Sequence, residues 1–480
     1  MPMHITFLGA ARTVTGSKHC LDVDGHRVLI DCCLFQGLKE LRERNWQPLP
    51  IQESSIEAVI LTHAHLDHCG YLPKIVQRGF HGPIYCTPAT AELAQVVLED
   101  AAKLQEEDAE RANRKSYTRH KPALPLFTLQ DADRAIRQFV AVPLGEKHAV
   151  RPGLEMEFSG AGHLLGAAFA RVQIATGKTI LFGGDLGRFD RPVLPDPAFV
   201  DSGDALLLES TYGDRIHEAD DDGERLAEIV RRAIERGGKL IVPAFALGRV
   251  EELLYWLGRL EQQQRIPVVP IYVDSPMAAA VLDAYRRRLG ELDELSTSAV
   301  DTGARHHVDT QGRRHQPGPT ERDMCAFCTT KLRVVQSIRE SREIQEDRTP
   351  SIVISASGMA TGGRVLHHLT RALPDPRHTI LFAGYQAVGT RGRMLIEGAR
   401  AVRIHGQEIT VRAEIHNIDS MSAHADQREI LHWLRGFKRA PSVTFLVHGE
   451  PGPMDTLKSL IEHELGWNVR TPAHQEKIDL

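Results

Sequence analysis

The segment THAHLDH, residues 62–68, packs three histidines and one aspartate into seven residues directly after an apolar run. Such a run is typical of a buried strand, and the loop that leaves it can turn several side chains inward. Imidazole binds zinc and iron, and a carboxylate among histidines favours a hydrolytic site over a closed structural one. The segment therefore requires a fold whose strand ends converge on a metal site. The candidate ligands in it are His63, His65, Asp67 and His68.

Further candidate ligands stand just after apolar runs elsewhere: His163 in GAGHLLGA, Asp185 in FGGDLG and His448 in LVHGE. Neighbouring side chains diverge, so the four groups of residues 62–68 can barely share one ion, and two ions are the better account. The adjacent glycines allow backbone and metal to approach closely. A lone histidine after a strand is more often a hydrogen-bonded structural residue, but the combination predicts a dinuclear site.

The chain has 480 residues, which exceeds the roughly 250–300 residues at which single cores stop growing. Short β-branched runs broken by glycine fill the first part of the chain. Helical and strand patterns then alternate, as in βαβ units with a parallel sheet. A strand-rich pattern like that of the first part returns near the end of the chain. We therefore expect an α/β domain of residues 213–400 inserted into a domain formed by residues 1–212 and 401–480.

Composition limits the location and the partners of the chain. No apolar run approaches the ~18 residues of a membrane span, and the first residues lack the pattern of a signal peptide. Seven irregularly spaced cysteines argue against a disulfide framework. We expect a cytoplasmic protein without a membrane partner. The net charge of −5 means that nucleic acid would have to bind through local basic clusters.

The HxHxDH run with a distant histidine, aspartate and histidine resembles the signature of the metallo-β-lactamase superfamily. The resemblance implies a four-layered αββα sandwich with two Zn²⁺ per chain, Mn²⁺ and Fe²⁺ being alternatives. One zinc would bind His63, His65 and His163, and the other Asp67, His68 and His448. Asp185 would bridge the two ions. Asp31, which follows the run VLI, would support the site by hydrogen bonding.

Further segments look like the β-CASP nucleases, the branch with the mRNA 3′-processing endonuclease and bacterial RNase J. They include DCCLFQG, GAGHLLGAA, ESTYGDR, PAFALGR, SGMATGGR, GYQAVGTRGR and SAHAD, and they span nearly the whole chain. The resemblance implies a ribonuclease, endonucleolytic, 5′-to-3′ exonucleolytic or both, that leaves 5′-phosphate and 3′-hydroxyl ends. His424 would be the general acid, and Glu209 would keep His424 charged and oriented.

Phosphates beyond the scissile one need further donors. Glycine-rich turns after strands offer backbone amides, as helix N-termini do for anions, and nearby side chains offer hydroxyls and charge. Contacts of this type fix position without reading sequence, which predicts broad or structure-dependent RNA selection. The candidates are Ser357, Thr361, Arg364, Arg391, Arg393 and Arg249.

Two other functions stay open at this point. The same metals could hydrolyse another phosphodiester or a small ester, and the chain could be a catalytically silent RNA-binding scaffold. The scaffold interpretation is disfavoured because all seven candidate ligands are present. A homodimer is one way to extend the RNA-binding surface. The sequence does not decide between internal cutting and trimming, nor does it give the RNA target, the native metal or the oligomeric state.

Overall fold

The computed structural model describes residues 2–115, 120–219, 221–293 and 327–480. Its internal contacts divide the chain into two compact units. The first unit comprises Met1–Phe189, Asp196–Ile216 and His424–Leu480, and the second comprises Asp190–Pro195 and His217–Ala423. The second unit is thus inserted into the first along the chain.

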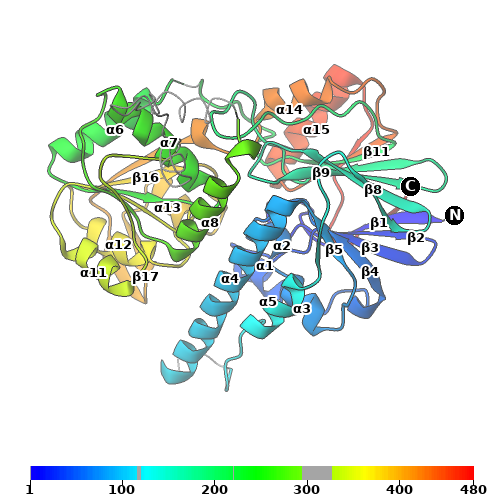
Figure 1. Ribbon diagram of the computed structural model, residues 1–480, viewed down its shortest axis with the longest axis horizontal. Helices are drawn as coiled ribbons and strands as arrows, with labels where there is room; N and C mark the ends of the chain where they lie inside the picture. Colours follow the sequence, from blue (N-terminus) through cyan, green and yellow to red (C-terminus); the bar gives the residue numbers. More distant parts are fainter. Residues whose placement is uncertain (1, 116–119, 220, 294–326) are drawn as a thin grey trace, which may run out of the picture. The chain divides into compact units, whose positions relative to one another are not determined.

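The first unit contains two sheets of seven strands each (Figure 1). The first sheet has the order β22-β1-β2-β3-β4-β5-β6, and the second has the order β21-β20-β11-β10-β9-β8-β7. The strands of the first sheet are β1 (Met3–Phe7), β2 (His19–Val23), β3 (His26–Ile30), β4 (Ile56–Ile60), β5 (Ile84–Cys86), β6 (Phe139–Ala141) and β22 (Lys477–Asp479). Those of the second are β7 (Lys147–Arg151), β8 (Leu154–Gly160), β9 (Ala168–Ile174), β10 (Thr179–Phe182), β11 (Ala205–Glu209), β20 (Val443–Val447) and β21 (Val469–Arg470).

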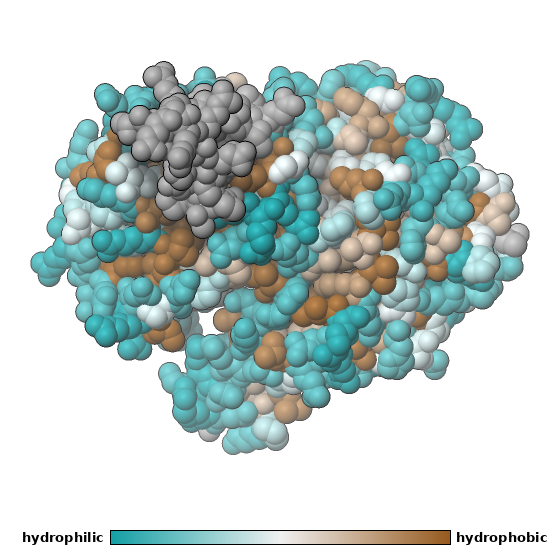
Figure 2. Space-filling model, in the orientation of Figure 1, coloured by the Kyte–Doolittle hydropathy of each residue, from teal (hydrophilic) through white to brown (hydrophobic). Residues whose placement is uncertain are grey.

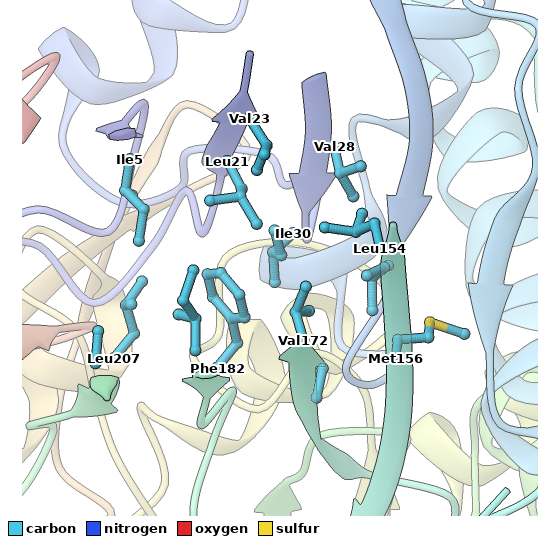
Figure 3. Close-up of a cluster of buried hydrophobic side chains, with 14 of the residues drawn as sticks. Ile5, Leu21, Val23, Val28, Ile30, Leu154, Met156, Val172, Phe182 and Leu207 are labelled. Carbon is cyan, nitrogen blue, oxygen red and sulfur yellow. The ribbon is translucent and has the colours of Figure 1, made fainter. Parts of the chain in front are cut away.

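One hydrophobic core joins the two sheets, as Figure 3 shows. Ile5, Leu21 and Ile30 of the first sheet meet Val172 and Phe182 of the second. In β1 buried and half-buried residues alternate, as the two-residue period of a strand predicts for a sheet with one face on the core. Burial of each large side chain of this kind contributes roughly 1.5–3 kcal/mol.

Helices cover the outer faces of both sheets, which completes the expected αββα sandwich. Helices α3, α4 and α5 pack together beside the first sheet, and α15 packs on β20 and β21 of the second. The helices of this unit are α1 (Lys39–Arg44), α2 (Leu66–Cys69), α3 (Leu72–Gln77), α4 (Pro88–Lys115), α5 (Leu129–Ile136), α14 (Gln427–Leu434) and α15 (Pro451–Leu465), with the short η1 (Glu53–Ser55).

Strand direction brings the candidate ligands to one edge of the sandwich. Strand β3 is parallel to β4, and β10 is parallel to β11, which is parallel to β20. Strand β8 runs the same way as β10, because each is antiparallel to β9. Parallel strands end at the same edge of a sheet, so the loops that follow these strands meet there.

The second unit is built on a six-stranded sheet with the order β14-β13-β15-β12-β16-β19, and all its pairings are parallel. The parallel sheet expected from the alternation of helices and strands is confirmed. Its strands are β12 (Leu240–Pro243), β13 (Ile271–Val273), β14 (Leu332–Val334), β15 (Ile352–Ser355), β16 (Thr379–Ala383) and β19 (Glu414–Ile418). The helices are α6 (Glu224–Glu235), α7 (Arg249–Gln262), α8 (Pro276–Arg287), α11 (Ile338–Glu346), α12 (Val365–Ala372) and α13 (Arg391–Ile396), with η2 (Leu289–Glu291) and η3 (Asp419–Met421).

The segment after residue 400 was expected to return to the first domain as one strand-rich stretch, and the structure differs from this. Strands β17 (Ala401–Ile404) and β18 (Gln407–Thr410) form a separate hairpin, and β19 pairs with β16 of the parallel sheet. The amides of Arg412 and Ala413 both donate to the carbonyl of Leu373, which turns the chain between the two elements. Residues 401–423 therefore lie in the second unit.

The surface and the cysteines are consistent with the composition. Figure 2 shows polar residues over much of the face in view, with hydrophobic patches among them. Among the described residues, no helix has the length and hydrophobicity needed to cross a membrane. The cysteines in the described part of the chain are free. Cys325 lies outside the described residues.

Candidate metal centre

The first cluster of candidate ligands lies within the first unit. One ligand atom each from His63, His65, His163 and Asp185 lies within 4.8 Å of all the others. Nδ1 of His65 is 3.2 Å from Nε2 of His63 and 3.1 Å from Nε2 of His163. Both of these Nε2 atoms are 3.4 Å from Oδ2 of Asp185. The loops after β4, β8 and β10 thus bring three imidazoles and one carboxylate oxygen to a single point.

A second cluster lies beside the first. Ligand atoms of Asp67, His68 and His448 lie within 4.8 Å of one another. Oδ2 of Asp67 is 3.4 Å from Nε2 of His448. Oδ1 of Asp185 is 3.2 Å from Nε2 of His68 and 3.5 Å from Nδ1 of His448. Asp185 therefore faces one cluster with each of its two oxygens.

The two clusters contain buried polar atoms that lack hydrogen-bond partners in the described part of the chain, and a pair of cations would compensate these atoms. Asp185 is 2% exposed, and neither of its carboxylate oxygens has a hydrogen-bond partner among the described residues. A buried carboxylate in this condition is costly unless a cation or a donor compensates it. Buried Nε2 of His68 likewise lacks such a partner. Histidine and carboxylate donors together form the ligand set of hydrolytic zinc sites.

Asp31, at the end of β3, orients the ring of the candidate ligand His68. Oδ2 of Asp31 is 2.8 Å from Nδ1 of His68. An ionised carboxylate only accepts, so Nδ1 keeps its proton. Burial lowers the pKa of His68, but Asp185 and Asp31 raise it well above its usual value, so a metal would displace the second proton from Nε2 to reach the lone pair there. Thr62 donates to Asp31 through its amide at 2.8 Å and through its hydroxyl. Sequence reasoning missed the role of Thr62, although this residue directly precedes the histidine run.

Burial lowers the pKa of three of the imidazoles. Burial and the neighbouring His68 lower the pKa of His63. Burial and His63 lower the pKa of His65 to about 3, and burial with His424 lowers the pKa of His163 well below its usual value. These rings are therefore neutral near pH 7, which is the form that binds a metal.

His424 has the opposite shift. Burial lowers its pKa, but the carboxylates of Glu209, Asp185 and Asp67 together more than offset that effect, and the pKa rises to about 9. Nδ1 of His424 lies 3.0 Å from each carboxylate oxygen of Glu209. The ring centre of His424 is 4.5 Å from that of His163. A charged imidazole thus stands beside the first cluster, where it can donate a proton.

Glu209 ends β11 and is fully buried. The amide of Leu186 donates to its Oε1 at 2.7 Å, and the hydroxyl of Thr211 donates to its Oε2 at 2.5 Å. The same hydroxyl is 3.2 Å from Nδ1 of His448. Thr211 therefore links the partner of His424 to the second cluster, a role that the sequence alone did not indicate.

The backbone is unusual at two of these positions. Asp31 and His448 have positive φ angles of 56° and 49°. Non-glycine residues in this region are uncommon, and they concentrate at functional sites where the surroundings hold them. In both residues the conformation turns a side chain at the end of a strand toward the ligand clusters.

All six candidate phosphate-binding residues lie in the second unit, and Ser357 and Thr361 share the loop after β15. Ser357 Oγ is 3.0 Å from Thr361 Oγ1 and accepts from the amide of Thr361. Nη1 of Arg391, at the start of α13, donates to the carbonyls of Ala360 and Thr361 at 3.1 and 3.2 Å. The structure thus brings Ser357, Thr361 and Arg391 together.

The other three arginines are held by carboxylates. Nη1 of Arg364 donates to Asp274 at 2.8 Å, and Asp274 also accepts from His368 at 2.6 Å and from Ser341 at 2.5 Å. Arg393 donates to Glu397 at 2.6 Å, and Arg249 donates to Glu252 at 2.5 Å. Arg249 is 5% exposed. Each of these three guanidinium groups thus pairs with a carboxylate.

Three known protein domains match the chain. Residues 26–233 match the Beta-lactamase superfamily domain, residues 250–395 match the Beta-Casp domain, and residues 408–472 match the Zn-dependent metallo-hydrolase RNA specificity domain. These matches cover both units and the segment that returns to the first unit.

Similar proteins span almost the whole chain. Ribonuclease TTHA0252 of Thermus thermophilus is 39% identical over 461 residues, which are 96% of each chain. Transcription termination factor FttA of Pyrococcus horikoshii is 30% identical over 501 residues, covering 100% of this chain and 71% of that protein. A crystal structure of a protein of unknown function from Enterococcus faecalis V583 has a TM-score of 0.50 at 12% identity, with full coverage of both chains, which shows a shared fold alone.

Proposed function

Because the chain belongs to the β-CASP family of metal-dependent hydrolases in the beta-lactamase superfamily, we propose that it is a two-zinc ribonuclease. It would hydrolyse RNA phosphodiester bonds and leave 5′-phosphate and 3′-hydroxyl ends. The observation that carries the proposal is the buried Asp185 carboxylate, whose two oxygens each face histidines of a different cluster. The ribonuclease name of the Thermus thermophilus relative supports the substrate.

The two clusters would each hold one zinc ion. His63, His65 and His163 would bind one ion, and Asp67, His68 and His448 the other, with Asp185 shared by both. When bound, the ions would supply Lewis-acid stabilisation of the phosphate charge and a water nucleophile active at neutral pH. Asp31 would fix the His68 ring, because it accepts the Nδ1 proton at 2.8 Å.

His424 would move the proton that the leaving oxygen requires. Its Nδ1 faces Glu209, so the proton donated to the 3′ oxygen is the one on Nε2, the opposite ring nitrogen. Glu209 keeps the imidazole charged. The contacts of Nδ1 with both carboxylate oxygens also fix the orientation of the ring. A general acid of this kind typically contributes about 10²–10⁴-fold to the rate. The resulting 3′-hydroxyl and 5′-phosphate follow from protonation of the 3′ oxygen.

Residues of the second unit would bind phosphates away from the cut. The hydroxyls of Ser357 and Thr361 and the guanidinium of Arg391 form one polar group there. Arg364, Arg393 and Arg249 would add positive charge, although each is already paired with a carboxylate. Such contacts hold a strand without reading its bases.

The proposal is tested by metal content and by a comparison of substrates. We expect two zinc ions per chain by elemental analysis, cleavage of a labelled single-stranded RNA, and product 5′ ends that can be ligated directly. DNA of the same sequence and bis-p-nitrophenyl phosphate serve as comparison substrates. RNA left intact while the small ester is turned over, or less than one ion per chain, would contradict the proposal. A circular RNA separates internal cutting from trimming, since only an endonuclease opens it.

A further inference from the structure

Two segments of the first unit lie beside each other next to the metal centre, where an antiparallel bridge joins Gly187 to His424. One follows Asp185, and the other follows His424. The amide of Ala425 donates to the carbonyl of Leu186 at 2.9 Å. The next contact is between Nε of Arg188 and both carboxylate oxygens of Glu429, at 3.2 Å each. The loop after β10 is therefore fixed to the start of α14.

An aromatic cluster lies at the far end of these segments. It consists of Phe189, Phe199 and His432, and we call it the aromatic platform. The ring centres of Phe189 and Phe199 are 5.7 Å apart, and that of His432 lies 5.0 Å from the first and 5.3 Å from the second. Phe199 is 54% exposed, His432 is exposed and Phe189 is partly exposed. Exposed phenylalanines that pack on one another need an explanation beyond core packing.

Contacts with α14 and with the glycine that follows it hold the platform in place. A Cβ atom added at Gly436 would lie 2.5 Å from the Phe199 ring, so the ring lies directly over this glycine. Nε1 of the buried Trp433 donates to the carbonyl of Ala198 at 2.9 Å, which ties the backbone before Phe199 to α14. Rings fixed in this way lose little conformational entropy when a flat partner stacks on them.

Two arginines border the platform along α14. Arg428, His432 and Arg435 follow one another at spacings of four and three residues, which places them on one side of the helix. Arg428 is exposed, and Arg435 pairs with Glu464 of α15 at 2.6 Å. Aromatic faces next to a guanidinium match an unpaired nucleobase and its phosphate, because every base has a face for stacking.

We propose that the aromatic platform stacks on an unpaired base of the RNA strand, while Arg428 contacts a phosphate of the same strand. This inference rests on the proposed ribonuclease function. The four residues from Asp185 to Phe189 span at most about 14 Å. That length corresponds to roughly four stacked nucleotides. A base held on the platform fixes the strand a few nucleotides from the scissile phosphate and so determines which bond is cut.

The test removes one ring at a time and compares RNA with a substrate too small to reach the platform. We would make Phe199→Ala and His432→Ala, with Trp46→Ala as the matched control, because Trp46 is another exposed aromatic residue of the first unit at 56% exposure. Binding of an unstructured RNA is measured by fluorescence anisotropy in a His424→Ala background, and turnover is measured in zinc-loaded protein with an intact His424.

We expect Phe199→Ala to weaken RNA binding about 5-fold to 150-fold, the range for loss of one stacked base. Turnover of bis-p-nitrophenyl phosphate should stay unchanged, and Trp46→Ala should bind RNA as the unmutated chain does. RNAs with one abasic nucleotide at successive positions give a second measurement. In the His424→Ala background, the chain with an intact platform should lose affinity at one position only, and the added Phe199→Ala change should give no further loss there.

Two results would overturn the inference and leave the ribonuclease proposal intact. One is RNA affinity that is unchanged in Phe199→Ala and insensitive to the abasic position. The other is a change of oligomeric state in Phe199→Ala at unchanged RNA affinity, which would make the platform a contact between copies of the chain. Unmutated protein that neither binds nor cuts RNA would instead refute the proposed function itself.

Discussion

Replacement of Glu209 by glutamine tests how the proton donor is controlled. Burial lowers the pKa of His424, but Glu209, with smaller contributions from Asp185 and Asp67, raises it from 6.5 to about 9. A shift of this size corresponds to about 3 kcal/mol of interaction with the charged form of the imidazole. Glutamine keeps the shape and a hydrogen-bond acceptor but removes the negative charge. The pKa of His424 should therefore fall toward its ordinary value of 6.5, because Asp185 and Asp67 alone then oppose the effect of burial.

The sign of the effect on activity follows from the role of the acid. A general acid works in its protonated form, so activity is lost as the pH rises through its pKa. With a pKa of about 9, His424 is about nine-tenths charged at pH 8, whereas a pKa of 6.5 leaves about 3% charged. We therefore expect kcat of Glu209→Gln at pH 8 to be lower by up to about 30-fold from protonation alone.

The assay is kcat for RNA cleavage from pH 6 to pH 10 with zinc-loaded protein. The alkaline decline should lie at a higher pH in the unmutated chain than in Glu209→Gln, where it should move toward pH 6.5. Glu155→Gln is the matched control, because Glu155 is an exposed glutamate of β8 in the same unit. An alkaline decline that does not move in Glu209→Gln would refute the assignment of Glu209 as the group that keeps His424 charged.

Four further predictions concern the metals and the core. His424→Ala should keep two zinc ions by elemental analysis but lose about 10²–10⁴-fold in kcat, and near-normal turnover would remove it from the acid role. Asp185→Asn should reduce zinc content, because a neutral amide bridges two dications poorly. Asp31→Ala leaves Nδ1 of His68 without its acceptor and should weaken zinc binding about 10–100-fold in a calorimetric titration. Phe182→Ala, which empties a 1% exposed position of the core between the sheets, should lower the free energy of unfolding by about 3–5 kcal/mol in urea.

The positions of the candidate ligands were the part of the site most accessible from the sequence. His63, His163, Asp185 and His448 each follow a run of apolar residues, and strands of one direction must end at a common edge. The sequence could not predict that the Thr62 hydroxyl donates to Asp31, because threonine occurs at many strand ends for reasons of β propensity alone.

Pairing partners were the part of the fold that the sequence could not give. The apolar run near residues 409–415 gives no sign that β18 closes a hairpin while β19 joins the parallel sheet beside β16. Strand partners depend on tertiary packing rather than on the local pattern. The aromatic platform was hidden for a similar reason, since Phe189, Phe199 and His432 share no periodicity and meet only through the contacts of α14.

The order of the strands has a consequence for synthesis of the chain on the ribosome. Strand β11 pairs with β10 on one side and with β20 on the other, and its five residues ALLLE are all buried. Its second neighbour, β20, starts at Val443, 234 positions after Glu209 (443 − 209). Because synthesis proceeds at roughly 5–20 residues per second, this edge of β11 stays unpaired for about 12–47 s. An unpaired apolar strand edge is a template for aggregation, and we expect a nascent chain to need a chaperone there. The same delay postpones the synthesis of His424 and His448, so under the proposed function we expect an incomplete chain to leave its own messenger uncut.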